Sequence, residues 1–252
     1  MIEPRKEVLI VTGGSRGIGA AVACLAGARG FAVAINYVEN GDAAARVKAK
    51  IESAGSQALL VQGDIGRETD VVELFKRSER ALGPVTGLVN NAGVTGGFAR
   101  VENIEGRMLE RLLAVNIGGS ILCAREAIKR MSTKHGGCGG AIVNISSLAA
   151  RTGGADEWVH YAATKGAINS FTIGLSREVA AEGIRVNAVA PGLIDTELHA
   201  ANGDPERPFR LQVTIPMKRP GTALEVAEGV LWLLSPAAAY TTGAILEIGG
   251  GR

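Results

Sequence analysis

Short apolar runs recur along the chain, separated by longer segments in which apolar and polar residues mix. The runs are rich in Val, Ile, Leu and Ala without strict alternation, which is typical of strands buried on both faces. They lie at residues 8–11, 31–36, 58–61, 85–89, 141–145, 184–190 and 244–248. The pattern therefore predicts seven buried strands.

Most of the intervening segments carry apolar residues at helical spacing, and a glycine or proline follows several of them. We expect helices at residues 20–29, 42–54, 68–82, 105–131, 161–182 and 224–234. Strands that alternate with helices indicate an α/β fold, in which a parallel sheet has helices on both faces. The prediction is one doubly wound domain over residues 1–252, because an eightfold barrel would need one more strand–helix unit.

Residues 193–222 depart from this pattern, since they contain prolines and no long apolar run. Long connections inside a compact domain are often binding loops or lids. We interpret this segment as a flap, which together with residues 95–103 shapes a substrate pocket.

Composition narrows the class of protein. Of the 252 residues 46% are hydrophobic and only 4% are aromatic, and the net charge is +2 with both signs scattered. Such a chain favours neither a nucleic-acid surface nor a polybasic membrane anchor. The first residues lack the apolar core of a signal peptide, and no apolar run is long enough to span a membrane. We expect a cytoplasmic protein that binds no nucleic acid and no membrane.

The three cysteines are widely spaced and odd in number, and the three histidines are equally dispersed. A disulfide framework or a zinc site needs closer and paired spacing. We therefore expect no metal and a reducing compartment.

The first predicted strand runs into a glycine-rich turn and then into a helix. Glycines let the backbone turn sharply and approach a pyrophosphate, which the positive helix N-terminus attracts. The spacing of the glycines departs from the usual G-x-G-x-x-G. The turn contains neither Gly-Lys-Ser nor Gly-Lys-Thr, so a triphosphate-binding loop is disfavoured. The turn predicts a dinucleotide site that includes Gly13, Ser15, Arg16, Gly17, Ile18 and Gly19.

The choice of dinucleotide depends on the end of the second strand. An acidic residue there would bind the 2′-hydroxyl of NAD, but Asn36 and Tyr37 occupy that position. Arg16 in the glycine turn could face a 2′-phosphate instead. Glu39 lies about 20 residues beyond the glycines and could act as the NAD-type acid from the loop. NADP(H) is therefore favoured, and NAD(H) is possible.

Tyr161 and Lys165 are expected on one face of a helix, because residues four apart differ by only about 40° in direction. An ammonium near a phenol favours the phenolate, so the pair is a candidate acid and base. Tyr-x-x-x-Lys also occurs in helices without any function, so the pair alone decides little.

Several motifs, taken together, resemble those of the short-chain dehydrogenase/reductase family. They are Thr12, Gly13, Gly17 and Gly19; Asn90, Asn91, Ala92 and Gly93; Asn116; Ser147; Tyr161 and Lys165; and Pro191, Gly192 and Thr196. The resemblance covers residues 8–250. It implies a Rossmann-type fold and an enzyme that transfers hydride between a nicotinamide cofactor and a carbonyl compound or secondary alcohol.

The resemblance also implies catalytic roles. Tyr161 would be the general acid in reduction and the general base in oxidation, and Lys165 would lower the pKa of Tyr161 and hold the nicotinamide ribose. Ser147 would polarise the substrate oxygen, with Ser146 as the alternative serine. Asn116 would anchor a water in a proton relay to Lys165. Ser147 and Tyr161 are 14 positions apart, one more than expected, and the extra residue should alter the pocket rim.

Cofactor contacts follow from the same resemblance. Asp64 and the Ile65 backbone would lie at the adenine, although Asp64 could instead be a turn residue. The remaining implied contacts are Asn90, Ala92 and Gly93 at the ribose and pyrophosphate, and Pro191, Gly192, Ile194 and Thr196 at the nicotinamide end. Thr196 could also begin a helix.

Other residues lead to weaker expectations. Arg207 and Arg210 in the flap could meet an acidic substrate, but we expect solvated charges, and we expect His160 at the surface. Trp158 either lines the pocket or covers a loop. Small residues in the 105–131 and 161–182 helices predict close contacts between subunits, hence a homotetramer, with a dimer as the alternative. A non-catalytic redox sensor or a dehydratase on the same fold are competing functions.

Overall fold

Seven strands form one parallel sheet in the computed structural model, which describes residues 7–252. The strands are β1 (Val8–Val11), β2 (Ala32–Tyr37), β3 (Ala58–Gln62), β4 (Gly87–Asn90), β5 (Gly140–Ile145), β6 (Ile184–Pro191) and β9 (Ile245–Ile248). Their order is β3-β2-β1-β4-β5-β6-β9, and every neighbouring pair is parallel. The predicted seven-stranded parallel sheet is confirmed.

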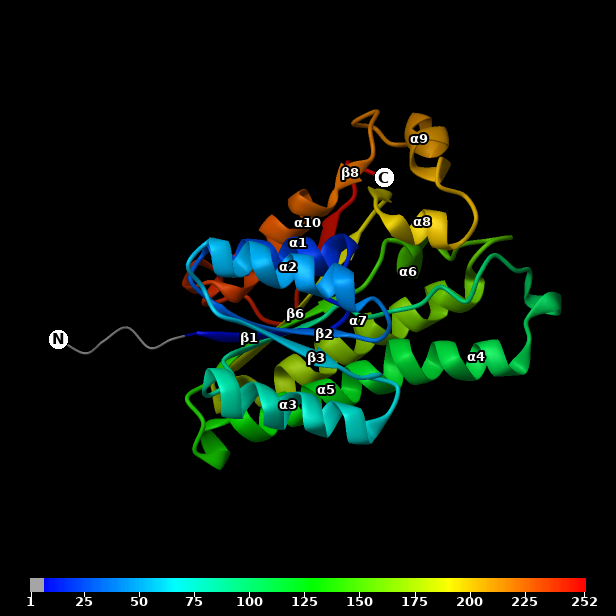
Figure 1. Cartoon of the computed structure of the whole chain (residues 1–252). Helices are drawn as coiled ribbons and strands as arrows, with labels where there is room; N and C mark the ends of the chain where they lie inside the picture. The colour runs from blue at the N-terminus through cyan, green and yellow to red at the C-terminus, as the bar shows by residue number, and fades with distance from the viewer. Residues whose placement is uncertain (1–6) are drawn as a thin grey trace.

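Helices cover both faces of this sheet (Figure 1). One face carries α1 (Gly17–Ala28), α2 (Gly41–Ser53) and α10 (Ala223–Leu234), and the other carries α3 (Glu68–Leu82), α5 (Ser120–Met131) and α7 (Val159–Val179). Successive residues of β1 point to opposite faces, so Leu9 packs with α1, α2 and α10, whereas Ile10 packs with α3, α5 and α7. A strand buried on both faces explains the continuous apolar runs.

The strand order reverses at β1, which pairs with β2 on one side and β4 on the other. In open α/β sheets ligands bind outside the carboxyl ends of the strands at such a point. The fold therefore directs attention to the segments that follow β1 and β4.

The helix expected over residues 105–131 is not one regular helix. It consists of α4 (Gly106–Leu113), a π-helical segment (Ala114–Gly119) and α5. Gly119 packs against Ile65 so closely that an added Cβ would lie 2.7 Å from the Ile65 side chain. A π segment retains the helical hydrophobic pattern, which explains why the sequence predicts one continuous helix.

The two ends of the flap predicted over residues 193–222 are held together by a pair of short strands. Its first strand, β7 (Ile194–Asp195), pairs in parallel with β8 (Gly221–Thr222). Two short helices, α8 (Glu197–Ala201) and α9 (Arg207–Leu211), lie between them, on the side of the sheet where the strands end (Figure 1). The short helix α6 (Ala149–Thr152) follows β5.

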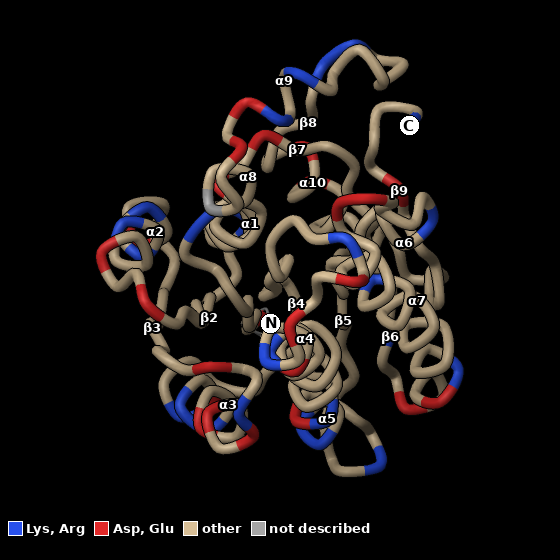
Figure 2. The backbone as a smooth tube through the Cα atoms, turned by 90° about the vertical axis from the view of Figure 1, so that its right-hand side faces the viewer, with Lys and Arg blue, Asp and Glu red and all other residues tan. Residues whose placement is uncertain are grey.

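Charged residues of both signs are dispersed over the helices and loops in Figure 2. This distribution agrees with the small net charge of +2. Among residues 7–252, none of the helices is both long and apolar enough to cross a membrane.

Candidate active site

A cavity of about 770 Å³ opens at the carboxyl ends of the strands, large enough for a cofactor and a substrate together. Its wall includes segments after β1, β2, β4 and β5, part of α7, and the flap. The predicted site residues that line it are Gly13, Ser15, Arg16, Gly17, Ile18, Asn36, Tyr37, Asp64, Ile65, Ala92, Gly93, Ser147, Tyr161, Lys165, Pro191, Gly192, Ile194 and Thr196. Gly19, Asn90 and Asn116 are not part of the wall.

The glycine turn after β1 forms one end of this cavity. Gly13 has a φ of +62°, and an added Cβ would lie 2.9 Å from the Ala92 Cα, so glycine is required there for two reasons. The helix α1 begins after Arg16, whose side chain does not cap it. Unpaired N–H groups of the first turn therefore lie beside cavity-lining Gly17 and Ile18. This arrangement suits the pyrophosphate of a dinucleotide.

Asn90 and Asn91, at the carboxyl end of β4, lie in different surroundings. Asn90 was expected beside the cofactor, but it is buried, and its amide donates to the Asn144 Oδ1 (3.0 Å) and to the Ser120 carbonyl (3.1 Å). It is the last residue of β4, and its side chain faces α5 rather than the cavity. Asn91 is the residue that lines the cavity, with its amide bonded to the Gly13 carbonyl (3.0 Å).

Gly19 also lies outside the cavity wall, although the sequence places it among the cofactor contacts. An added Cβ at this position would collide with the Asn91 side chain and the Gly13 carbonyl. Gly19 therefore allows α1 to pack closely behind the turn, which is a packing role that a sequence motif does not distinguish from a ligand contact.

The end of β2 carries no acidic side chain. Asn36 is buried and donates to the Gly63 carbonyl (2.8 Å), so its amide joins two strand ends. Tyr37 lines the cavity, as do Arg16 from the glycine turn and Glu39 from the loop after β2. Arg16 is exposed, so its guanidinium is accessible to a ligand at this end.

Asp64 is both a turn residue and part of the cavity wall. Its carboxylate accepts the Gly66 N–H (2.9 Å) and a hydrogen bond from the Arg111 guanidinium (2.6 Å). Partial burial raises the pKa of Asp64, but the bonds from Arg111 and Gly66 outweigh it and hold the pKa below its usual value. Arg111 comes from α4 and lines the cavity, and no sequence motif indicates it.

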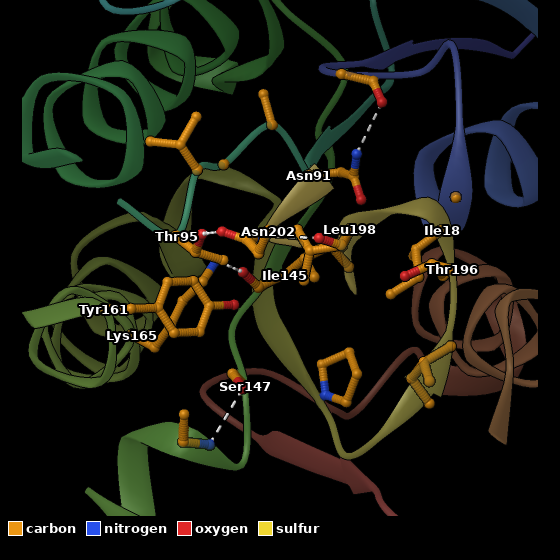
Figure 3. Close-up of a pocket in the computed structure, with 18 of the residues that line it drawn as sticks. Ile18, Asn91, Thr95, Ile145, Ser147, Tyr161, Lys165, Thr196, Leu198 and Asn202 are labelled. Atoms are coloured by element: carbon orange, nitrogen blue, oxygen red, sulfur yellow. Dashed lines mark hydrogen bonds between the residues drawn. The ribbon is translucent and has the colours of Figure 1, made fainter. Parts of the chain in front are cut away.

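The catalytic candidates meet midway along the cavity (Figure 3). Tyr161 and Lys165 project from the same helix, and the Lys165 Nζ lies 5.5 Å from the centre of the Tyr161 ring. The Lys165 Nζ donates to the Ile145 carbonyl at 2.7 Å. The Ser147 Oγ accepts the Ala149 N–H (3.1 Å), which leaves the serine proton free to be donated.

Ser146 is engaged elsewhere. Its hydroxyl is bonded to the Asn169 Oδ1 (2.6 Å) and to the Lys165 carbonyl (3.2 Å), and its side chain is buried. The Ser147 hydroxyl, by contrast, reaches the Tyr161 phenol. The geometry therefore favours Ser147 over Ser146 as the polarising serine.

Desolvation is the largest influence on the pKa values of Tyr161 and Lys165. It raises the pKa of Tyr161 to about 12, and the hydrogen bond from Ser147 lowers this pKa only in part. Burial also lowers the pKa of Lys165 to about 8. The sequence led us to expect that Lys165 lowers the Tyr161 pKa, but in this structure burial raises that pKa and only the hydrogen bond from Ser147 lowers it, so the phenol is protonated at neutral pH.

Asn116 lies in the π-helical segment behind Tyr161 and Lys165. Its amide donates to the Val94 carbonyl (2.9 Å) and to the Thr164 Oγ1 (3.0 Å), while its Oδ1 accepts the Val94 N–H (2.9 Å). Through these bonds Asn116 links the loop after β4, at Val94, to α7, at Thr164. A water held by Asn116 would therefore have to bind its main-chain carbonyl rather than its side chain.

The far end of the cavity is aromatic, and it corrects two expectations. His160 is buried rather than at the surface, because it packs against the loop at Gly96. Arg207 is also buried rather than solvated, since its guanidinium lies over Trp158. Trp158 lines the cavity, which is the first of the two positions that the sequence left open for it.

His199 completes this aromatic end from α8. Its Nε2 lies 3.1 Å from the Ile194 carbonyl, which can only accept, so Nε2 carries the proton. Burial and the nearby charge of Arg207 lower the pKa of His199, so the ring is neutral. Its Nδ1 is a buried acceptor without a partner in the described part of the chain.

The chain matches known proteins over nearly its whole length. Residues 13–252 match the family model described as enoyl-(acyl carrier protein) reductase. The chain is 49% identical over 245 residues to "Uncharacterized oxidoreductase YgfF" of Escherichia coli strain K12, covering 97% of this chain and 99% of that one. It is 34% identical over 252 residues to 2-(S)-hydroxypropyl-CoM dehydrogenase 3 of Xanthobacter autotrophicus, covering 98% and 96%.

A solved structure shares the fold closely. A blue fluorescent protein from a metagenomic library, in complex with NADPH, superimposes with a TM-score of 0.88 at 32% identity. The superposition covers 97% of each chain.

Proposed function

Because the chain belongs to the short-chain dehydrogenase/reductase family, we propose that it is an NADP(H)-dependent enzyme that interconverts carbonyl compounds and secondary alcohols. The observation that supports this most directly is the convergence of Ser147, Tyr161 and Lys165 on one cavity beside an uncapped helix N-terminus. The relative named for a hydroxypropyl substrate supports the same chemistry.

A bound nicotinamide dinucleotide supplies or accepts the hydride. The chain supplies the proton: in reduction, the neutral Tyr161 phenol donates to the substrate oxygen as charge develops there. Ser147 donates a second hydrogen bond to the same oxygen, while its Oγ accepts the Ala149 N–H. In oxidation the proton moves the other way, from the substrate hydroxyl to the Tyr161 phenolate.

Lys165 and Asn116 would act around this pair. Lys165 donates one of its three N–H groups to the Ile145 carbonyl, which leaves two for a ribose hydroxyl. The Asn116 carbonyl lies in the π-helical segment and already accepts the Ser120 hydroxyl (3.0 Å), and its second lone pair is the candidate anchor for a relay water.

The preference for NADP(H) is carried by Arg16 and by the lack of an acid at the end of β2. Arg16 is the exposed cation of the glycine turn and would pair with a 2′-phosphate. The NADPH in the metagenomic relative supports this choice. We expect Arg16→Ala to raise the KM for NADPH by about tenfold or more and to leave the KM for NADH nearly unchanged.

Glu39→Gln is the companion variant, because Glu39 lines the same end of the cavity. Removal of its charge should lower the KM for NADPH and leave NADH no better bound. If Arg16→Ala affects both cofactors equally, the NADP(H) assignment is wrong.

The test of the function is a steady-state assay of cofactor absorbance against a panel of ketones, aldehydes and secondary alcohols. We expect consumption of NADPH with at least one carbonyl and slower consumption of NADH. Tight binding of NADPH without turnover of any compound would contradict an enzyme and favour a redox sensor. Turnover of substrate without net change in NADPH would favour a dehydratase.

A further inference from the structure

One indole ring connects the catalytic tyrosine with a flap cation. The Trp158 ring lies 5.8 Å from the Tyr161 ring, and the Arg207 Cζ lies 4.5 Å above Trp158. Phe98 stacks on the same indole at 4.8 Å, almost parallel to it. Arg207 and Tyr161 both line the cavity, so a single small molecule can contact the guanidinium and the phenol together.

Arg207 is built into this end of the cavity, whereas its neighbour Arg210 is not. Only 8% of the Arg207 side chain is exposed, compared with 57% for Arg210. Arg210 pairs with Asp204 and is not part of the cavity wall. The two arginines therefore form a natural contrast between a cavity residue and a surface charge.

Two buried donors at this end have no acceptor. The Arg207 Nε and the Trp158 Nε1 make no hydrogen bond among the described residues. Both atoms can only donate. A buried donor without an acceptor is unfavourable, and it is satisfied when a ligand brings an acceptor. Arg207 and Trp158 both line the cavity, which thus offers a positive charge to an oxygen-rich group, while the two unpaired N–H groups beside it are closed to solvent in this structure.

Glu157 occupies part of the guanidinium in this structure. Its carboxylate pairs with the Arg207 Nη2. The Glu157 side chain is 40% exposed, so it can return to water, but the buried guanidinium cannot. A ligand carboxylate can therefore replace Glu157 without leaving either charge buried and unpaired.

We propose that Arg207 binds an anionic group of the substrate, so that the enzyme acts on oxo acids or hydroxy acids whose carboxylate lies apart from the reacting carbon. This inference rests on the proposed function and specifies its substrate class. A planar guanidinium matches a carboxylate in a bidentate pair. The substrate carbonyl then lies at Tyr161, whose ring contacts the same Trp158 indole as Arg207 does.

The first test compares oxo acids with their methyl esters, which keep the carbon skeleton and lose the charge. The probes are 4-oxopentanoate and 5-oxohexanoate, in which the carboxylate is separated from the carbonyl carbon. We expect kcat/KM for the best acid to exceed that of its ester by about 10- to 100-fold, mainly through KM. Arg207→Met should abolish this preference, and Arg210→Met, the matched control, should keep it.

Glu157→Gln separates substrate binding from a purely structural ion pair. If Arg207 binds the substrate carboxylate, loss of the competing Glu157 charge should lower the KM for the acid, opposite to Arg207→Met. If the pair only holds the flap closed, both variants should raise the KM for acid and ester alike. Arg207→Lys keeps the charge without the Nε donor and should show an intermediate preference. It also serves if Arg207→Met does not fold.

Failure of this inference is distinguishable from failure of the proposed function. Turnover of neutral ketones with no preference for acids, or equal effects of Arg207→Met and Arg210→Met, would overturn the inference alone. If no compound is turned over, calorimetry with 5-oxohexanoate in the presence of NADP⁺ decides. Binding that is lost in Arg207→Met, and absent for the ester, supports the inference, and absence of binding contradicts it.

Discussion

At the scale of single residues, the raised pKa of Tyr161 predicts opposite pH dependences for the two directions of reaction. With a pKa of about 12 set by desolvation, the phenol is protonated at neutral pH. Reduction needs this protonated form, so its kcat/KM should not rise with pH. Oxidation needs the phenolate, so its kcat/KM should rise by up to about tenfold per pH unit below the pKa.

The measurement is a pH profile of kcat/KM in both directions with one carbonyl–alcohol pair. Ser147→Ala should slow both directions by about 10²–10³-fold and should not reverse the slopes. An oxidation rate with its maximum below pH 7 would contradict the protonation state assigned to Tyr161.

Residue patterns pointed to candidate reacting groups but not to their surroundings. Ser147, Tyr161 and Lys165 were predictable because their chemistry depends on residue type and spacing. The buried position of Arg207 was not predictable, since it depends on Trp158 and Glu157 from a distant segment. From the sequence alone, an arginine in the flap is expected to be a solvated charge.

At the scale of elements, Asn116 should hold the loop after β4 against α7. Asn116→Ala would leave the N–H and carbonyl of Val94 without their partner and would remove one of the two hydrogen bonds of the Thr164 hydroxyl. Each buried group left unpaired costs about 1–3 kcal/mol, so the free energy of unfolding should fall measurably. Urea unfolding of this variant measures the loss.

Ser53→Ala is the control, because that exposed serine bonds only within its own helix. It should change the free energy of unfolding by less than about 0.5 kcal/mol. If Asn116→Ala is as stable as this control, Asn116 does not support the loop and our account of the π-helical segment is wrong.

The elements themselves were largely predictable, and the exceptions have a physical reason. Each strand is an apolar run because the sheet is buried on both faces. The π-helical segment at residues 114–119 was not foreseen, since one wider turn hardly disturbs helical periodicity. The short helices of the flap are also too brief to leave a periodic signal.

At the scale of the whole molecule, we predict a homotetramer. Gly166 and Gly174 lie on α7, and an added Cβ at either would meet nothing within 4 Å. This open space allows a helix of another subunit to approach closely. Gly174→Glu should therefore leave the subunit fold intact and lower the mass measured by sedimentation. A wild-type protein that sediments as a stable monomer at micromolar concentration would contradict this prediction.

The order of the strands in the sheet could not be predicted from the hydrophobic pattern alone. Alternation of strands and helices gives a parallel sheet, but it does not say which strands are neighbours. The observed order leaves β1 and β4 adjacent, which brings the glycine turn and the loop at Asn91 to one cavity. The family resemblance, rather than periodicity, placed Gly13 and Gly93 at one cofactor in advance, and neither the resemblance nor periodicity gave the strand order.

The central claim is that Tyr161 transfers the proton in a nicotinamide-dependent reaction. The most direct measurement compares turnover and NADPH affinity of the wild type and Tyr161→Phe, with the best carbonyl substrate from the panel. We predict that Tyr161→Phe loses turnover by at least about 10²–10³-fold while its Kd for NADPH stays within about threefold of the wild type. Wild-type turnover in Tyr161→Phe would contradict the account.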